Sequence, residues 1–270
     1  MKYLANAKIN IRLNVLGKNE NNYHNLSMVN AKISLADEIE ITLCNENRVS
    51  YSVEELNHLE NNLCLNVLNE ITTKYNIKEK YNIYIKKNIP MGAGLGGGSS
   101  DVACIINALD KVHNLNLTLE EKINIGVKYG ADVPYCLIDN LALVEGIGEK
   151  LTFLNNKLKE RVAVVYPNIF VSTKEVFQKV KKYSNAIDRK TIEKYILNKE
   201  YEKILFNDLE EPSFEIEPKL KQIKESLLQV GYTIMSGSGS SMLVFIKDDK
   251  DLEKIKQIYP DYLIFDTYIL

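Results

Sequence analysis

The 270-residue sequence lacks the features that would place it in several large classes of protein. It contains no apolar run near the roughly 18 residues that a membrane span needs. Lys8 and Arg12 interrupt the apolar residues near the N-terminus, where a signal peptide would have its core. The formal net charge is −2 and no basic block is present, which argues against nucleic acid as a main partner. We therefore expect a cytoplasmic globular protein.

Cysteine and proline are also scarce. The four cysteines form no C-x-x-C pair and the three histidines do not cluster with them, so we expect free thiols and no zinc site. With six prolines and no low-complexity tract, little of the chain is expected to be disordered. Hydrophobic residues make up 45% of the sequence, which is enough apolar material for one large or two modest domains.

Glycine is concentrated in one place, with five glycines among the seven residues 92–98. An alternating apolar run over residues 81–89 precedes them, and apolar residues at helical spacing follow over residues 102–112. This pattern predicts a strand, a glycine loop and a helix. Glycine allows positive φ angles and close approach of the backbone to a ligand, and a helix start offers unpaired N–H groups. The stretch therefore indicates a phosphate-binding loop.

Two common phosphate loops do not fit these residues. The pattern G-x-G-x-x-G is present, but a dinucleotide site needs a carboxylate about 20 residues later at the end of a second strand. Here no strand is expected before residue 141. A Walker A loop needs a lysine before its serine or threonine, whereas Gly98-Ser99-Ser100 has none. A close-packed turn in which Ser99 or Ser100 caps the helix remains an alternative.

Phosphoryl transfer would need further groups beside the loop. The acceptor hydroxyl needs a carboxylate to take its proton and a cation to stabilise the developing alkoxide, and Mg²⁺ would neutralise phosphate charge. Asp132 precedes an apolar run, but a role as cap of a helix starting near Pro134 is equally compatible with its position. Lys8 projects from the polar face of a first strand over residues 3–16, where a water-facing lysine is the commoner arrangement.

The remaining patterns mix hairpins with helices, which indicates an α+β protein in two halves. The polar stretch 155–160 predicts a domain boundary, giving domains at 1–156 and 157–270. Further strands are predicted at 29–33, 37–43, 141–145, 149–153, 161–166, 232–235, 242–246 and 262–269. Further helices are predicted after Asn62, from the capping box at Thr118 to Gly130, after Ser172, and over roughly 189–209, 217–230 and 252–258.

Residues 90–101, Pro-Met-Gly-Ala-Gly-Leu-Gly-Gly-Gly-Ser-Ser-Asp, resemble the ATP loop of the galactokinase, homoserine, mevalonate and phosphomevalonate (GHMP) kinase superfamily. Residues 7–10, 23–26 and 130–134 are similar, in order, to motifs of the 4-diphosphocytidyl-2-C-methyl-D-erythritol kinases within it, and residues 207–210 and 236–241 also fit. The similarity spans nearly the whole chain. It implies a two-domain GHMP kinase fold, with an N-terminal ATP-binding domain like ribosomal protein S5 domain 2, a C-terminal α+β domain, and the active site between them.

The resemblance also implies an activity and a set of site residues. The expected reaction is ATP-dependent phosphorylation, with Mg²⁺, of the 2-hydroxyl of a cytidine-diphosphate-linked methylerythritol in the non-mevalonate isoprenoid pathway. By motif position, Asp132 is similar to the catalytic base and Lys8 to the catalytic lysine. The ATP-binding positions are Pro90, Met91, Gly92, Ala93, Gly94, Leu95, Gly96, Gly97, Gly98, Ser99 and Ser100. The substrate-binding positions are Asn10 near the reacting hydroxyl, and Tyr23, His24, Thr173 and Phe177 around the cytidine.

Some alternatives remain open. Phe177 shares an apolar stripe with Val180 and is also compatible with a plain core position. Asn22 stands where the family usually has glycine and Asn25 where it usually has glutamate, which leaves a sister kinase acting on another small alcohol as an alternative. The S5-like fold also serves RNA-binding proteins, but the near-neutral charge argues against that function.

Overall fold

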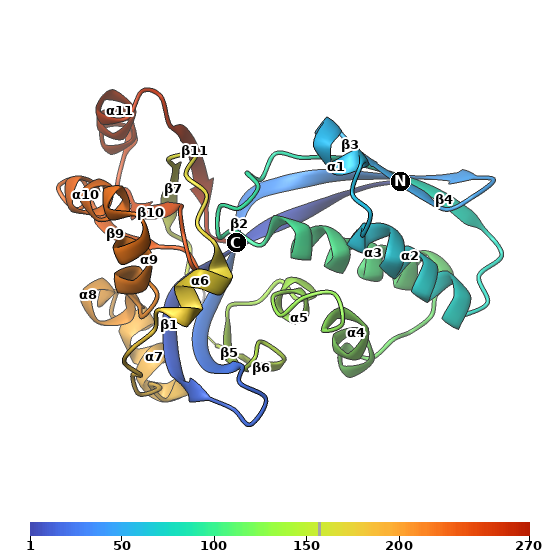
Figure 1. Ribbon diagram of the computed structural model, residues 1–270, viewed down its shortest axis with the longest axis horizontal. Coiled ribbons are helices and arrows are strands. Elements are labelled where there is room, and N and C mark those ends of the chain that lie inside the picture. The colour runs from blue at the N-terminus through green and yellow to red at the C-terminus, as the bar shows by residue number, and fades with distance from the viewer. Residues whose placement is uncertain (156–157) are drawn as a thin grey trace. The chain divides into compact units, whose positions relative to one another are not determined.

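The computed structural model describes residues 1–155 and 158–270 (Figure 1). Contacts within the chain define two compact units, each built from several segments. The first unit consists of Met1–Ala7, Leu35–Ile89 and Gly96–Asp139, and the second of Lys8–Ser34, Pro90–Leu95 and Asn140–Leu270. The predicted domain boundary, between residues 156 and 157, lies outside the described residues and stays a prediction.

Two long strands contribute residues to both units. They are β1 (Lys2–Lys18) and β2 (His24–Cys44), which are neighbours in the strand order. In the first unit, the second half of β2 pairs antiparallel with β4 (Lys80–Lys86), and β4 pairs parallel with β3 (Arg48–Tyr51). The alternating residues Tyr81, Ile83 and Ile85 of β4 are buried, as their spacing predicted.

The helices of the first unit are held by recognisable end signals. Asn62 accepts a hydrogen bond from the Leu65 amide at the start of α2, and Thr118 and Glu121 form the predicted capping box of α4. Among the described residues, no helix is both long and apolar enough to cross a membrane. The helices are α1 (Glu54–Asn57), α2 (Leu63–Lys74), α3 (Gly97–His113), α4 (Leu119–Gly126) and α5 (Val133–Cys136).

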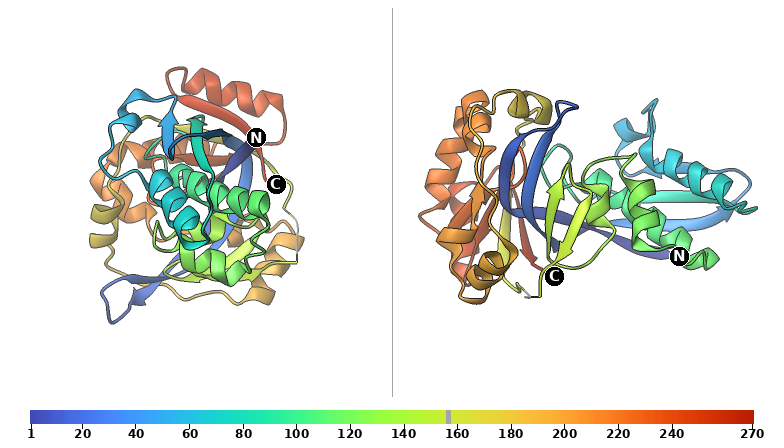
Figure 2. Two further views of the ribbon diagram at one scale, coloured as in Figure 1. Left: turned by 90° about the vertical axis from the view of Figure 1, so that its right-hand side faces the viewer. Right: turned by 90° about the horizontal axis from the view of Figure 1, so that it is seen from below.

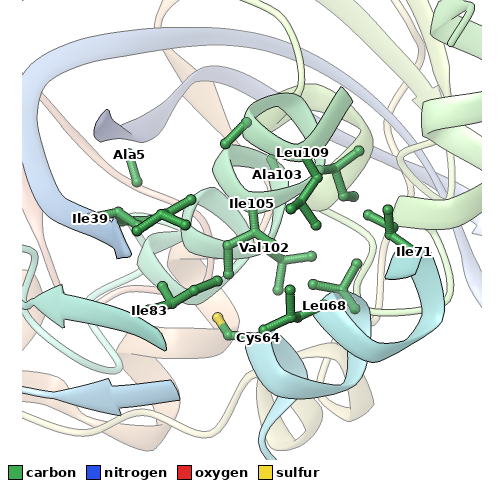
Figure 3. Packing of buried hydrophobic residues seen from close by; sticks show 14 of the residues in the cluster. Ala5, Ile39, Cys64, Leu68, Ile71, Ile83, Val102, Ala103, Ile105 and Leu109 are labelled. Atoms are coloured by element: carbon green, nitrogen blue, oxygen red, sulfur yellow. The ribbon is translucent and has the colours of Figure 1, made fainter. Parts of the chain in front are cut away.

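A single apolar cluster joins these helices to the strands. Figure 3 shows Ile39 and Ile83 of the sheet packed against Leu68 of α2 and against Val102 and Ile105 of α3. All five side chains are essentially inaccessible to solvent. Since each such buried side chain stabilises the fold by about 1.5–3 kcal/mol, the cluster fixes α3 firmly against the sheet. The start of α3 is therefore a rigid part of the first unit.

Three charged side chains are buried beside this cluster. The Lys87 Nζ lies 2.5 Å from Asp37 Oδ2 and 2.6 Å from Asp101 Oδ2. Burial raises the pKa of Asp101, against the opposing effect of Lys87 and with a further rise from Asp37, to about 7. Burial alone would lower the pKa of Lys87, but the two carboxylates outweigh it and raise that pKa. Paired in this way, a buried ammonium remains charged.

In the second unit, additional strands pair with β1 and β2, and a separate sheet is also present (Figure 2). The first half of β2 pairs antiparallel with β5 (Ala142–Gly146), which pairs with β6 (Lys150–Phe153), and β1 pairs parallel with β8 (Phe206–Asn207). The separate four-stranded sheet has the order β11-β7-β10-β9 and is entirely antiparallel. Its strands are β7 (Arg161–Tyr166), β9 (Tyr232–Met235), β10 (Met242–Phe245) and β11 (Leu263–Tyr268).

Helices α10 (Pro218–Leu227) and α9 (Glu210–Ile216) pack against each other, and α10 also contacts β9 of this sheet. Leu220, Ile223 and Leu227 form the buried face of α10. The remaining helices of the unit are α6 (Thr173–Gln178), α7 (Arg189–Leu197), α8 (Tyr201–Ile204) and α11 (Asp249–Ile258). The predicted α+β class is therefore confirmed.

Two glycine-containing turns pack against each other in the second unit. A Cβ atom on Gly94 would lie 2.3 Å from the Ser236 carbonyl oxygen and 2.9 Å from that of Gly239, and Gly94 has a φ of +75°. The Ser236 hydroxyl donates a hydrogen bond of 3.0 Å to the Gly94 carbonyl. Only glycine satisfies both the space and the backbone angle at this position, so the contact fixes the first half of the glycine loop.

Several predicted elements differ from the structure. The strands predicted at 29–33 and 37–43 are one strand, β2, because residues 34–36 contain neither glycine nor proline to interrupt it. The helix predicted to reach Gly130 ends at Gly126, where the chain tightens into i→i+3 hydrogen bonds from Lys128 to Ile125 and from Tyr129 to Gly126. Helix α6 ends at Gln178, before Val180.

The water-facing interpretation of the polar face of β1 is also wrong. Lys8, Asn10, Arg12 and Asn14 are between 1% and 8% exposed. Each has a hydrogen-bond partner in the second unit: Lys8 Nζ donates to Asn10, Asn10 to Asn30, Arg12 Nε to Asn14, and Asn14 to Ser184. Alternation along a strand cannot distinguish solvent from polar partners, and here polar partners cover this face.

The Gly94 contact predicts a large difference between two glycine substitutions. Gly94→Ala should lower stability by at least about 1–2 kcal/mol, because alanine is strained at positive φ and the Ser236 carbonyl occupies the space of its Cβ. Gly98→Ala should fold normally, since no atom lies within 4 Å of a Cβ built there. Thermal unfolding of both variants beside the parent protein tests this. Equal melting temperatures for the two variants would contradict the packing described.

The buried Asp101 predicts a distinctive pH dependence of stability. Its pKa in the folded protein is about 7, whereas in the unfolded chain it is about 3.9. At a pH between these two values, the folded state therefore holds a proton that the unfolded state has lost. Its contribution to stability is complete below about pH 4 and declines as the pH rises to about 7. Asp101→Asn lacks this decline, so its stability relative to the parent protein should increase from pH 5 to pH 7.

Chemical denaturation at several pH values measures this difference. Asp110→Asn is the matched control, because Lys122 and the Leu117 amide hold the pKa of Asp110 below its ordinary value despite partial burial. Its difference from the parent protein should stay constant over the same pH range. Parallel stability curves for Asp101→Asn and the parent protein would show that Asp101 does not hold the extra proton.

Candidate active site

Helix α3 begins without a side-chain cap. Its N-cap residue is Gly96, with a φ of +67°, and no side chain accepts a hydrogen bond from the first turn. The Ser100 hydroxyl instead donates to the Asn6 carbonyl at 2.7 Å, and its amide bonds to the Gly96 carbonyl. The alternative in which Ser99 or Ser100 caps the helix is therefore wrong. The amides of residues 97–99 precede the first intrahelical bond, which is the arrangement that holds an anion.

The loop before this helix is shaped by alternate glycines. Gly92, Gly94 and Gly96 all have φ between +66° and +75°, the left-handed region that glycine enters without strain. Other hydrogen bonds hold the loop's carbonyls: the Met91 carbonyl accepts from the Tyr166 hydroxyl, and the Ala93 carbonyl from the Ser241 amide. The carbonyls are thus engaged by the second unit, and the N–H groups at the helix start remain suited to a ligand.

Asp132 lies beside this helix start in the first unit. It is the N-cap residue of α5, but its side chain makes no capping hydrogen bond, so the helix-cap interpretation is wrong. A Cβ built on Gly130 would lie 3.5 Å from Ser99 Oγ, which places the turn 130–132 against the first turn of α3. Asp132 itself is half-buried. The structure therefore places the turn that bears Asp132 beside the start of α3, and the role of Asp132 stays a prediction.

Lys8 and Asn10 lie beside the other half of the loop, in the second unit. The Lys8 amide donates to the Leu95 carbonyl at 2.9 Å, and Lys8 Nζ donates to Asn10 Oδ1 at 3.0 Å. Asn10 in turn donates to Asn30 Oδ1 at 2.7 Å. A Cβ on Gly237 would lie 3.5 Å from Asn10 Oδ1. Lys8 is only 4% exposed, and a buried ammonium needs such partners. These hydrogen bonds therefore fix the position of the Lys8 side chain.

The sequence analysis missed Asn30. Its Nδ2 atom is buried and has no hydrogen-bond partner among the described residues. The available signal was alternation within residues 28–32, where Asn30 and Lys32 interrupt an apolar strand. An orphaned amide beside Lys8 and Asn10 is a further group that a bound hydroxyl or phosphate oxygen would satisfy.

An aromatic group forms another part of the second unit. The His24 and Phe177 rings are stacked with centroids 5.1 Å apart, and the Tyr183 ring is tilted against His24 at 6.2 Å. His24 Nε2 is buried without a hydrogen-bond partner among the described residues, and burial, with a smaller effect of Lys18, lowers the pKa of His24. The ring is therefore neutral at pH 7 and has a nitrogen available for a polar ligand.

Two other predicted substrate residues are close to this group in the chain, Tyr23 beside His24 and Thr173 one helical turn before Phe177 on α6. Tyr23 is 65% exposed, next to His24 in the chain. Thr173 Oγ1 and Ser238 Oγ lie 2.7 Å apart and share a hydrogen bond. Phe177 is half-buried, and because α6 ends at Gln178 it does not share a helical stripe with Val180. The observation that favoured a core role for Phe177 is thereby removed, and its substrate role stays a prediction.

Asn22 stands before Tyr23, where the family usually has glycine. Its φ is +64°, in the left-handed region. Asparagine is among the residues that tolerate this conformation best after glycine. The turn that carries Tyr23 is closed by hydrogen bonds of the Asn21 and Tyr23 amides to Asn19 Oδ1. The substitution therefore preserves the backbone conformation of the turn.

No group of three or more His, Cys, Asp or Glu side chains within residues 1–155 and 158–270 is arranged to hold a metal ion.

Comparison with known proteins supports one family. Residues 62–140 match the family described as GHMP kinases N terminal domain, and residues 186–264 match GHMP kinases C terminal. The chain is 38% identical to the 4-diphosphocytidyl-2-C-methyl-D-erythritol kinase of Clostridium perfringens strain 13, covering 92% of this chain and 89% of that protein. It is also 38% identical to the same kinase of Thermoanaerobacter pseudethanolicus, covering 97% and 91%.

Solved structures give the same result. A crystal structure of 4-(cytidine 5'-diphospho)-2C-methyl-D-erythritol kinase aligns with a TM-score of 0.84 at 26% identity, covering all of both chains. The homoserine kinase of Cytophaga hutchinsonii aligns with a TM-score of 0.71 at 14% identity, covering 97% of this chain and 94% of that one, which shows a shared fold alone. The expected two-domain GHMP kinase fold is thus confirmed. The chain belongs to the GHMP kinases, and within them to the family of 4-diphosphocytidyl-2-C-methyl-D-erythritol kinases.

Proposed function

We propose that the protein transfers the γ-phosphoryl group of ATP to the 2-hydroxyl of 4-(cytidine 5'-diphospho)-2-C-methyl-D-erythritol, in the non-mevalonate isoprenoid pathway. The observation that carries this proposal is the uncapped start of α3, preceded by positive-φ glycines and flanked by the turn that bears Asp132. A helix start of this kind suits a triphosphate. The named activity of relatives at 38% identity supports the choice of substrate.

The chemistry assigns a role to each polar group. Amides of the glycine loop hold the phosphates, and their dipoles stabilise negative charge as the γ-phosphoryl group moves. The substrate oxygen forms a bond to the γ-phosphorus while the bond to the β,γ-bridging oxygen breaks, and ADP departs. Asp132 accepts the hydroxyl proton. The Lys8 ammonium stabilises the charge on the attacking oxygen, and Asn10 holds Lys8 in place through its 3.0 Å hydrogen bond.

Asp132 belongs to the first unit and Lys8 to the second. Their meeting around the acceptor hydroxyl is part of this proposal. The glycine loop passes from one unit to the other between Leu95 and Gly96, and β1 does so between Ala7 and Lys8. Mg²⁺ would neutralise the triphosphate charge when bound.

The aromatic group of the second unit is the proposed cytosine site. A pyrimidine ring would pack against Tyr23 and Phe177, and stacking on an aromatic side chain contributes about 1–3 kcal/mol per base. The orphaned His24 Nε2 would bond to the polar edge of the base, and Thr173 would contact the nucleotide from the start of α6. An unpaired ring nitrogen discriminates strongly, because a ligand without a matching group leaves it unsatisfied.

The substrate assignment predicts a specific requirement for turnover. The purified protein should convert ATP to ADP only when Mg²⁺ and the cytidylated methylerythritol are both present. Mevalonate and homoserine lack the base that the aromatic group would bind, so they should give no turnover above background. A coupled ADP assay with the three acceptors measures this. An equal rate with mevalonate or homoserine would assign the protein to a sister kinase of the superfamily instead.

The role of Asp132 predicts a loss in kcat rather than in ATP binding. Asp132→Asn should lower kcat by about 100- to 10,000-fold, since the amide cannot accept the proton, while ATP affinity stays near that of the parent protein. Asp139→Asn is the matched control, because Asp139 is an exposed carboxylate seven residues further along the same unit. Single-turnover kinetics and nucleotide titration separate the two effects. Full turnover by Asp132→Asn would exclude Asp132 as the base.

A further inference from the structure

The buried pair Asp37 and Asp101 faces one ammonium group in the first unit. Lys87 Nζ lies 2.5 Å from Asp37 Oδ2 and 2.6 Å from Asp101 Oδ2, and the three side chains are between 0% and 6% exposed. Asp37 Oδ1 accepts from the amides of Asn88 and Ile89 at 2.6 and 2.8 Å. Asp101 Oδ1 is buried and has no hydrogen-bond partner among the described residues. With both carboxylates ionised, the cluster carries one uncompensated negative charge.

This cluster lies directly beneath the start of α3. A Cβ on Gly97, the first residue of the helix, would lie 3.5 Å from Lys87 Nζ. Asp101 is four residues later on the same helix and therefore one turn below. The amides of residues 97–99 belong to the turn before it and precede the first intrahelical bond. Any anion held by them is separated from the buried carboxylates by about one turn of helix, through protein rather than water, where charges interact strongly.

Neighbouring groups do not compensate the charge. Cys64 of α2 and Tyr51 of β3 are titratable side chains that interact with Asp101, and burial raises the pKa of both, that of Cys64 to about 12. Both groups are therefore neutral at pH 7. The charge of the cluster is decided only by whether the carboxyl pair holds a proton. Burial, opposed by Lys87 and reinforced by Asp37, raises the pKa of Asp101 to about 7, so both states are accessible near neutral pH.

We propose that nucleotide binding at the glycine loop is coupled to uptake of one proton by the Asp37–Asp101 pair, with Lys87 holding the two carboxyl groups together. The proton comes from solvent and converts a carboxylate to a carboxylic acid, so that the cluster beneath the phosphates becomes neutral. Asp37, Asp101 and Lys87 are positioning residues in this scheme and do not touch the substrate. The inference rests on the proposed ATP site at the start of α3.

Reciprocity sets the direction of the pH effect. If bound phosphates favour the protonated pair, protonation must favour bound phosphates by the same factor. Nucleotide affinity should therefore be highest when the pair is protonated, below about pH 7, and fall as the pH rises through this value. A merely structural ion cluster would give no such dependence. Lys87 cannot produce it, because the two carboxylates raise its pKa further above neutrality.

Isothermal titration of MgADP at pH 7, in two buffers of different ionisation enthalpy, counts the protons taken up on binding. The parent protein should take up a measurably larger fraction of a proton than Asp101→Asn, and the difference cancels the protonation of MgADP itself. Asp110→Asn is the matched control, since this carboxylate on the same helix pairs with Lys122 at 2.7 Å. It should match the parent protein. Between pH 6 and pH 8, the Kd of the parent protein should rise about fivefold more than that of Asp101→Asn.

The outcomes separate this inference from the proposed function. Equal proton uptake by the parent protein and Asp101→Asn, with normal MgADP binding in both, would overturn the coupling and leave the ATP site intact. Absence of MgADP binding to the parent protein would overturn both. If Asp101→Asn does not fold, Asp37→Asn removes the second carboxylate of the same pair, and it should lose the extra proton uptake in the same way.

Discussion

The central physical constraint in this protein is a helix start that its own side chains do not satisfy. The N-cap position of α3 is a glycine in the left-handed region, and the nearby serine hydroxyl is bonded elsewhere. The first N–H groups of a helix carry partial positive charge and need acceptors. Because the apolar cluster of the first unit fixes α3 against the sheet, the helix start cannot easily move to find them. The phosphates of a nucleotide are the acceptors that this arrangement suits.

The same helix start is influenced from the inside by the buried carboxylates. A negative group near the first turn stabilises the helix through its dipole, and Asp101 follows one turn later, since the first turn of α3 itself contains no acidic residue. A phosphate bound on the outer side uses the same dipole and the same N–H groups. The two negative groups therefore compete for one source of positive potential. Lys87 relieves part of this competition, and a shared proton would relieve the rest.

The glycines of the loop serve three different physical needs, which composition alone does not distinguish. Gly94 is required by space, because the Ser236 carbonyl occupies the position of a Cβ. Gly96 is required by its backbone angle at the N-cap. Gly98 has neither constraint, since nothing lies near it and its φ is not positive. Because Gly98 has no side chain, the amides at the start of α3 stay accessible, and this accessibility matters only for binding a ligand.

The local features of the site could be predicted from the sequence, and the long-range ones could not. The strand, loop and helix around residues 81–112 follow from periodicity and glycine, and the capping box at Thr118 is as expected. The partnership of Asp37, Lys87 and Asp101 could not be found, because its members are 50 and 14 residues apart and no local pattern links them. Likewise, Asn30 and Tyr183 become recognisable only through their contacts with Asn10 and His24.

The proposed substrate site includes a part of the chain that the core constrains little. The homoserine kinase described above shares this fold, so the fold alone does not select an acceptor. The aromatic group instead comes from the start of β2 with His24, from α6 with Phe177, and from the segment after α6 with Tyr183, where the Ser184 amide bonds to the Val15 carbonyl. Tyr23 is largely exposed and contributes nothing to the core. The turn that carries Tyr23 can change without disturbing the core, because the Asn21 and Tyr23 amides bond locally to Asn19 Oδ1. That separation allows one phosphate-binding framework to serve different acceptors, and in the proposed cytosine site it leaves a neutral histidine nitrogen, without a partner among the described residues, for the edge of a pyrimidine.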